Sequence, residues 1–384
     1  MSNIGLNQNI SIGGRQFHLQ TATNIEEGFI RTEVFEQGRL LFIEYFEYER
    51  RDTTLKGETE LRIRRLLDQF HQSVISELET IFEISHILKE KEDSISHLKI
   101  GAIFLSLHLF DKAESHLLRA IDLDSDLYSA FILLGRCYFL QKRYHKAAQT
   151  LEPLIKARID YPDLYNLYGL ILMEQKNYVQ ALNQFRQAIK LNPDYKEAYF
   201  YLATTIIQRI GFLKMQNKKE EIQRDLKFFA LVLKKIRKIG NQEDKNFVSQ
   251  VEQALNNKKL EAIYSLMYDY YNKNFYQKTP VEVVGYEFYL WLKYLPEQLD
   301  CETLSRFEAR ISQAISQNPN YPDLWNYLAL IHLMLCRDYF LKGLDNFKEA
   351  TKINPRFVKA RKNLRLVEND GREFLSLIKA IVKD

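Results

Sequence analysis

Glycine, proline and cysteine are all scarce in this chain of 384 residues. It contains 14 glycines and 8 prolines, too few for the many tight turns of an all-β fold. Its three cysteines, Cys137, Cys301 and Cys336, form no CxxC pair, which fits unpaired thiols in a reducing compartment. The composition predicts a mainly helical protein without a disulfide framework.

Long hydrophobic runs and a secretory leader are also missing. No stretch reaches the 18 or so uninterrupted apolar residues that a membrane-spanning helix needs. Residues 1–16 have no basic start followed by an apolar run, the pattern of a signal peptide. We therefore expect a cytoplasmic protein with no membrane span.

Familiar catalytic and cofactor motifs are absent from the sequence. It has no GxxxxGK[ST], GxGxxG, HExxH or GxSxG, the patterns that bind phosphates, dinucleotides and zinc or present a nucleophilic serine. His86, His97 and His108 are evenly spaced, but a turn expected near residues 91–94 would break their common face. We predict no enzymatic activity, no cofactor and no metal site.

A period of 34 residues organises the part of the chain after residue 93. Gly101, Gly135 and Gly169 lie 34 apart. Two more sets keep this spacing: Phe110, Tyr144 and Tyr178, and Ala113, Ala147 and Ala181. Such a period is typical of a helix–turn–helix solenoid, whose units stack to bury their apolar faces. We predict an array over residues 94–208, with repeats at 94–127, 128–161 and 162–195 and a fourth first helix from 196.

The best copy, residues 162–193, shows why these residue types recur. Tyr165, Tyr168 and Leu172 share one helical face with Gly169, and the glycine lets a second helix approach closely. The pattern resembles the signature of the tetratricopeptide repeat family, whose positions fall here on Tyr165, Tyr168, Gly169, Leu172, Ala181, Phe185, Ala188 and Pro193. The resemblance implies a mostly α fold, a right-handed α-solenoid of helix–turn–helix repeats.

The resemblance also implies a binding surface. In this family, certain positions of each first helix line a concave groove. The candidate groove residues are Leu98, Ile132, Arg136, Phe139, Asn166, Leu170 and Met173. Leu98 and Ala102 stand where chaperone-binding members carry lysine and asparagine, so we reject a carboxylate clamp. A largely apolar groove suits an amphipathic helix or a peptide, although the chain's own N-terminal helix or another protomer could also fill it.

Residues 1–52 read as a small β cap rather than as helix. Residues 15–21 and 28–35 alternate in polarity, residues 36–39 form a glycine turn, and residues 40–48 complete a third strand. We predict a three-stranded antiparallel meander, which needs a cover on its apolar face.

Residues 53–93 read as a connector built on one long amphipathic helix, at 58–90. Its apolar stripe consists of Ile63, Leu67, Phe70, Val74, Ile81, Ile84 and Leu88. Glu77 interrupts this near-heptad stripe. The stripe could pack on the meander or the first repeat, or it could form a coiled coil in a homodimer.

Residues 209–300 depart from the period. Their first part is helical and rich in lysine, above all at 214–238, which suits either a solvated helix face or a basic docking patch. Their second part is aromatic-rich, with two degenerate repeat helices expected on either side of Thr279 and Pro280.

The repeat returns in residues 301–384. Residues 321–330 nearly copy residues 161–170. We predict a second repeat-like unit with a long turn near Arg337 and Asp338, followed by a capping helix from Arg356.

Taken together, these patterns predict a non-enzymatic adaptor that binds a partner peptide or helix in the concave groove. The alternative is a nucleic-acid-associated regulator that uses the basic 214–238 segment. A net charge of +4 neither demands nor excludes a polyanion partner, and a nucleic-acid partner is the weaker of the two expectations.

Overall fold

The computed structural model describes residues 4–48, 56–257, 259–271 and 281–383. The chain forms two compact units. Unit 1 contains residues 1–92, 106–108 and 280–384, and unit 2 contains residues 93–105 and 109–279. Segments from the two ends of the chain thus fold together in unit 1.

Unit 1 begins with an antiparallel sheet of four strands in sequential order: β1 (Gly5–Ile12), β2 (Arg15–Asn24), β3 (Phe29–Glu36) and β4 (Arg39–Glu47). The prediction of three strands was wrong, because β1 lacks the apolar alternation that marks the other strands. It is an edge strand with mostly exposed side chains. The predicted glycine turn is present, with positive φ at Gln37 and Gly38.

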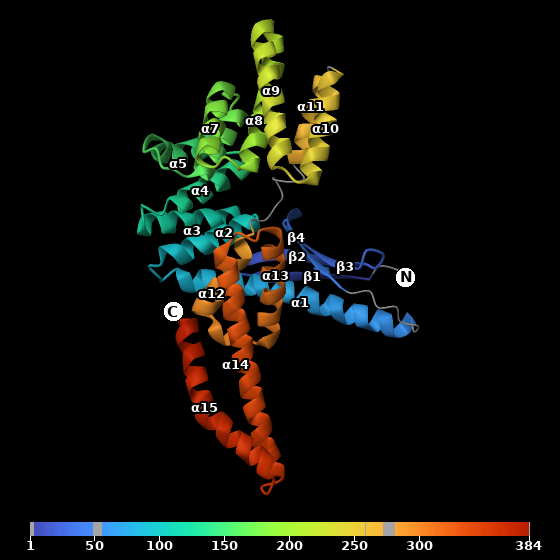
Figure 1. The fold of residues 1–384 in the computed structure, drawn as a ribbon, viewed down its shortest axis with the longest axis vertical. Coiled ribbons are helices and arrows are strands. Elements are labelled where there is room, and N and C mark those ends of the chain that lie inside the picture. Colours follow the sequence, from blue (N-terminus) through green and yellow to red (C-terminus); the bar gives the residue numbers. More distant parts are fainter. Residues whose placement is uncertain (1–3, 49–55, 258, 272–280, 384) are drawn as a thin grey trace. The chain divides into compact units, whose positions relative to one another are not determined.

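The helix α1 (Lys56–Leu88) lies across this sheet (Figure 1). The Phe82 ring meets Phe17 of β2 at 5.9 Å, and His71 Nδ1 lies 2.7 Å from the hydroxyl of Thr21. Leu67, Val74 and other members of the apolar stripe are buried. The stripe therefore packs on the meander, as one of the two interpretations of this helix predicted.

The C-terminal part of unit 1 is helical: α12 (Val283–Tyr294), the 3₁₀ turn η2 (Pro296–Gln298), α13 (Cys301–Gln317), α14 (Pro322–Ile353) and α15 (Val358–Lys383). The turn predicted near Arg337 and Asp338 is wrong, because α14 passes through both residues without a break. No glycine or proline interrupts the helix there, and Arg337 pairs with Asp338 at 3.0 Å.

Unit 2 consists of ten helices within its described residues: α2 (Ser94–Ser106), α3 (Phe110–Leu123), α4 (Tyr128–Leu140), α5 (Tyr144–Lys156), α6 (Pro162–Glu174), α7 (Tyr178–Leu191), α8 (Lys196–Met215), α9 (Lys219–Ile239), α10 (Gln242–Asn256) and α11 (Leu260–Tyr271). The first three pairs follow the predicted repeats. The fourth first helix, expected to end near Ile207, continues to Met215.

The glycines of the repeats mark close contacts between paired helices. A Cβ atom built on Gly101 or Gly135 would lie within 3 Å of Leu117 or Leu151. One built on Gly169 would lie 2.7 Å from the Phe185 ring, which is fully buried. The predicted role of Gly169 is therefore confirmed: it lets α7 lie against α6.

We expect Gly169→Ala to destabilise unit 2 by about 1–2 kcal/mol, because the new methyl group must displace a rigid buried ring. Gly211→Ala in α8 is the matched control, since no atom lies within 4 Å of a Cβ built there. It should gain about 0.5–1 kcal/mol from helix propensity. The free energy of unfolding of both variants is measured by urea titration followed by far-UV circular dichroism. If both substitutions changed it in the same direction, the close-packing role of Gly169 would be contradicted.

Candidate functional site

The candidate site lies on the first helices of the repeats. In the structure α4 contacts α6, and α6 contacts α8. The second helices lie behind them, since α4 packs on α5, α6 on α7 and α8 on α9. The first helices α4, α6 and α8 therefore form one continuous row, as the solenoid prediction requires.

The predicted groove residues differ in how far their side chains are exposed to solvent. Five are buried, each with at most a tenth of its surface exposed: Leu98, Phe139, Asn166, Leu170 and Met173. Ile132 and Arg136, both on α4, are half-buried. These two side chains are therefore the members of the predicted set that a partner can reach without rearrangement of the repeats.

Arg136 is a half-buried cation without a counter-ion. Within the described residues, no carboxylate lies within 4 Å of its guanidinium. It lies close enough to Tyr201 of α8 to act on it electrostatically. Burial raises the pKa of that phenol far above its ordinary value, with Glu197 and Tyr271 acting in the same direction and Arg136 opposing them. A guanidinium kept out of water without an anion is costly, so this position favours an acidic group supplied from outside.

A polar cluster lies at the start of α6 and α8. The Tyr195 hydroxyl donates to Asp163 Oδ1 at 2.5 Å and accepts from Asn166 Nδ2 at 3.3 Å. Burial and the Asp163 carboxylate both raise the pKa of Tyr195, so the phenol stays protonated. Asn166 Oδ1 is buried with no hydrogen-bond partner in the structure, and such an orphan acceptor is uncommon in a folded interior.

At α8, the helices α10 and α11 of the same chain pack against the row of first helices. The Phe200 ring stacks on Tyr270 of α11 at 4.7 Å and meets Phe247 of α10 at 5.5 Å. Asp244 joins the same contact, since it accepts from Tyr270 and pairs with Lys196 at 2.9 Å. This closure could not be predicted from the sequence, because the aromatic-rich region after residue 260 carries no sign of the surface that it contacts.

Three basic side chains on or just before the lysine-rich helix α9 form ion pairs, whereas the exposed Lys234, Lys235 and Lys238 form none within the described residues. Lys218 pairs with Glu221, Arg224 with Glu220, and Arg237 with Glu252. Its apolar side chains Phe229, Leu233 and Ile236 are buried. The arrangement is that of a solvated helix face, and the nucleic-acid alternative stays a prediction.

The evenly spaced histidines do not share a site. His86 is exposed on α1, and His97 is buried on α2, where its Nδ1 lies 2.9 Å from Nδ1 of His116. His108 lies between α2 and α3 and bonds to the Leu41 carbonyl at 2.6 Å. His97 and His108 are thus held by separate contacts.

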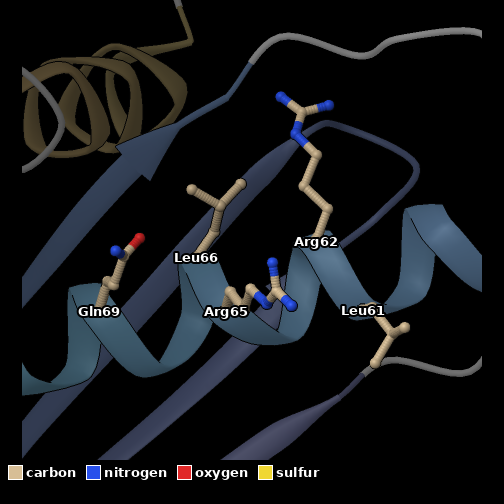
Figure 2. Close-up of a pocket in the computed structure, with 5 residues that line it drawn as sticks. All are labelled: Leu61, Arg62, Arg65, Leu66 and Gln69. Atoms are coloured by element: carbon tan, nitrogen blue, oxygen red, sulfur yellow. The ribbon is translucent and has the colours of Figure 1, made fainter.

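A shallow hollow lies along α1 in unit 1, lined by Leu61, Arg62, Arg65, Leu66 and Gln69 (Figure 2). Two guanidinium groups with apolar neighbours give it a basic character, but nothing in its geometry indicates a particular ligand. In the part of the chain that the structure describes, no helix is both long and apolar enough to cross a bilayer.

Comparison with known proteins agrees with the repeat geometry. A tetratricopeptide repeat model matches residues 98–162, and a second repeat model of the same kind matches residues 169–205. A search of curated proteins finds no match.

Among solved structures, the chain is similar to YrrB, described as a tetratricopeptide repeat protein with an unusual peptide-binding site. The identity is 15%, with 63% of this chain and 95% of that chain covered, and the TM-score is 0.31. It is also similar to PilF from Pseudomonas aeruginosa, at 13% identity and a TM-score of 0.32, with 62% and 96% covered. Such distant likenesses carry no argument about function. The repeat matches, together with the repeated helix pairs and glycine contacts, show that residues 98–162 and 169–205 of this chain form tetratricopeptide repeats.

Proposed function

We propose that this protein is an interaction scaffold that binds a segment of a partner protein along the first helices α4 and α6. The partner segment is an amphipathic helix or extended peptide. It places apolar side chains against Ile132 and an acidic side chain opposite Arg136. Protein interaction is the general use of tetratricopeptide repeats, and the segment and its acidic residue are the specific part of the proposal.

The observation that carries the proposal is the unpaired state of Arg136. Its side chain is half-buried, and its guanidinium has no carboxylate within ion-pair distance in the described residues. An arginine offers a rigid fork of donors that matches a carboxylate. In such a partly dry setting a charge-assisted hydrogen bond is stronger than on an open surface.

Asn166 supports the same surface. Its orphan Oδ1 can accept a hydrogen bond if a partner backbone displaces the neighbouring side chains, since Nδ2 already donates to Tyr195. The partner segment therefore lies between α4 and α6, away from the end that Tyr270 closes.

The test is capture of partners from a lysate of the source cell, with proteins identified by quantitative mass spectrometry. We expect the double variant Arg136→Glu with Asn166→Ala to capture at least about ten-fold less of one specific partner. The reason is that a repulsion between the introduced glutamate and the partner's acidic side chain would replace the attraction to Arg136. Far-UV circular dichroism should show unchanged helicity.

Arg119→Glu provides the matched control, since Arg119 is exposed on the second helix α3. It changes the net charge in the same way and should leave capture intact. Once a partner is known, an Asp or Glu to Lys change in its segment should restore binding to Arg136→Glu. If the wild type and the double variant captured the partner equally, the groove would not be the binding site.

A further inference from the structure

The end of the hairpin formed by α14 and α15 has an unusual charge pattern. Residues 350–367 contain six basic side chains and no acidic one. Large apolar side chains are exposed in the same stretch: Ile353 at 83%, Val358 at 67%, Leu366 at 49% and Phe357 at 47%. We call residues 350–367 the hairpin tip. It combines exposed apolar surface with charges that are all positive.

The tip extends beyond the helices that support α14. At the start of α13, the Cys301 sulfur lies 3.6 Å from Asp338 Oδ2 and 3.4 Å from Lys342 Nζ. From that level α14 runs 11 residues further to Ile353, about 16 Å at the rise of an α-helix. Figure 1 shows α14 and α15 side by side in this stretch, joined at its far end. The tip is therefore a convex projection of the hairpin.

The two faces of the first turns of α15 differ sharply. Ala360 is buried, and Leu364 and Val367 are half-buried on the same face. The opposite face carries Val358, Lys362 and Leu366 at a spacing of four residues, all exposed. Apolar and basic side chains thus point away from the hairpin together.

Most of the positive charge at the tip is unneutralised. Lys352 pairs with Glu349 at 3.3 Å. No described carboxylate lies within ion-pair distance of the other five side chains: Arg356, Lys359, Arg361, Lys362 and Arg365. Five free cations around exposed aliphatic groups leave both kinds of surface available to a partner.

We propose that the hairpin tip is a peripheral membrane-binding site that inserts Ile353, Phe357 and Val358 into the interface of an anionic bilayer. Basic residues near such a surface each contribute about 1 kcal/mol of attraction. The apolar side chains add to this when they enter the boundary between headgroups and acyl chains. A convex tip suits a bilayer, which deforms around it, better than a folded protein partner, which would need a matching cavity.

Nucleic acid fits the tip less well than a bilayer does. Phosphate contacts use the basic side chains, but exposed Ile353, Val358 and Leu366 gain nothing from a polyanion in water. The aliphatic side chains and the charges find complementary partners together only at a lipid interface.

The experiment is co-sedimentation of the full chain with vesicles at low salt. Vesicles of phosphatidylcholine alone are compared with vesicles that contain a third phosphatidylglycerol. We expect binding to the anionic vesicles only. Arg361→Gln, Lys362→Gln and Arg365→Gln together should weaken it by about 100-fold, from three lost attractions of about 1 kcal/mol each.

A second variant separates insertion from charge. Ile353→Ser with Val358→Ser keeps every basic residue and should weaken binding about ten-fold or more, because apolar burial in the interface is lost. Both positions are exposed, so neither variant removes a core side chain.

Lys234→Gln, Lys235→Gln and Lys238→Gln on α9 form the matched control, since these lysines are exposed and the charge change is the same. This control should bind anionic vesicles like wild type. Three outcomes would overturn the proposal: no wild-type binding at low salt, equal loss in the α9 control, or a serine variant that binds normally. Binding to random RNA through the tip without vesicle binding would also assign it to nucleic acid instead.

Discussion

Replacing Arg310 by methionine should destabilise unit 1 by about 3 kcal/mol at pH 8. Arg310 Nη2 pairs with Glu287 of α12 at 2.8 Å, and its Nη1 lies 3.4 Å from Glu77 of α1. Removing a cation from such a cluster leaves its carboxylates uncompensated, a change that typically costs 3–5 kcal/mol in a fully buried setting. The partial exposure of Arg310, 31% of its side chain, puts the expected value at the lower end.

The tryptophans make this measurement selective. Both, Trp291 and Trp325, belong to unit 1, so tryptophan emission during urea unfolding follows unit 1 while unit 2 contributes none. The double variant Arg310→Met with Glu287→Gln should recover part of the loss, because one unpaired carboxylate is removed with its partner. Equal unfolding midpoints for wild type and Arg310→Met would show that the cluster contributes no net stability.

Between pH 5 and pH 8, the ionisation of Glu44 should lower the stability of unit 1 by up to about 3 kcal/mol. Burial raises the pKa of Glu44 from 4.5 to about 7; Arg310 opposes this shift, and Glu77 and Glu287 add to it. The folded state therefore prefers the protonated carboxyl. The stabilisation from this preference is complete below the unfolded pKa of 4.5 and is lost as the pH rises through about 7.

Glu44→Gln should flatten this pH dependence and raise stability at pH 8, because an amide stays neutral at every pH. Some dependence of stability on pH should remain, since burial also raises the pKa of Glu287. Glu47→Gln, exposed at the end of the same strand, provides the control and should leave the slope unchanged. The measurement is urea unfolding by tryptophan emission at pH 5, 6, 7 and 8; a stability that rises with pH in wild type would contradict this account.

The two effects are linked through one cluster of charges. At pH 5, where Glu44 holds a proton, the cost of Arg310→Met should be smaller than at pH 8. Arg306 adds a second cation, 3.4 Å from Glu77 Oε1. Unit 1 is thus held together in part by ion pairs among α1, α12 and α13, and Glu44 of β4 lies close enough to interact with them electrostatically.

The repeats were predictable because their signals are local. The glycine that permits close helix contact and the residue it contacts lie 16 positions apart within one repeat, as for Gly169 and Phe185. The 34-residue period then repeats this contact in each of the three repeats.

The long-range contacts of unit 1 could not be predicted, because their partners lie more than 200 residues apart. Glu77 looked like a defect in a coiled-coil stripe, but it is the partner of Arg306 and Arg310. The sequence shows that a charge interrupts the stripe and cannot show which distant cation meets it. The edge strand β1 was missed for a related reason, since its pairing with β2 rather than its side chains makes it a strand.

The sequence by itself thus determined the repeat architecture and the identity of the residues on each first helix. Only the tertiary structure decided which of those residues stay open. Arg136 and Ile132 are half-buried, whereas Asn166 and Met173 are buried and Phe200 is covered by Tyr270 of α11. The reason is physical: periodicity fixes the direction of a side chain along its own helix, but its exposure depends on which distant segment packs against it.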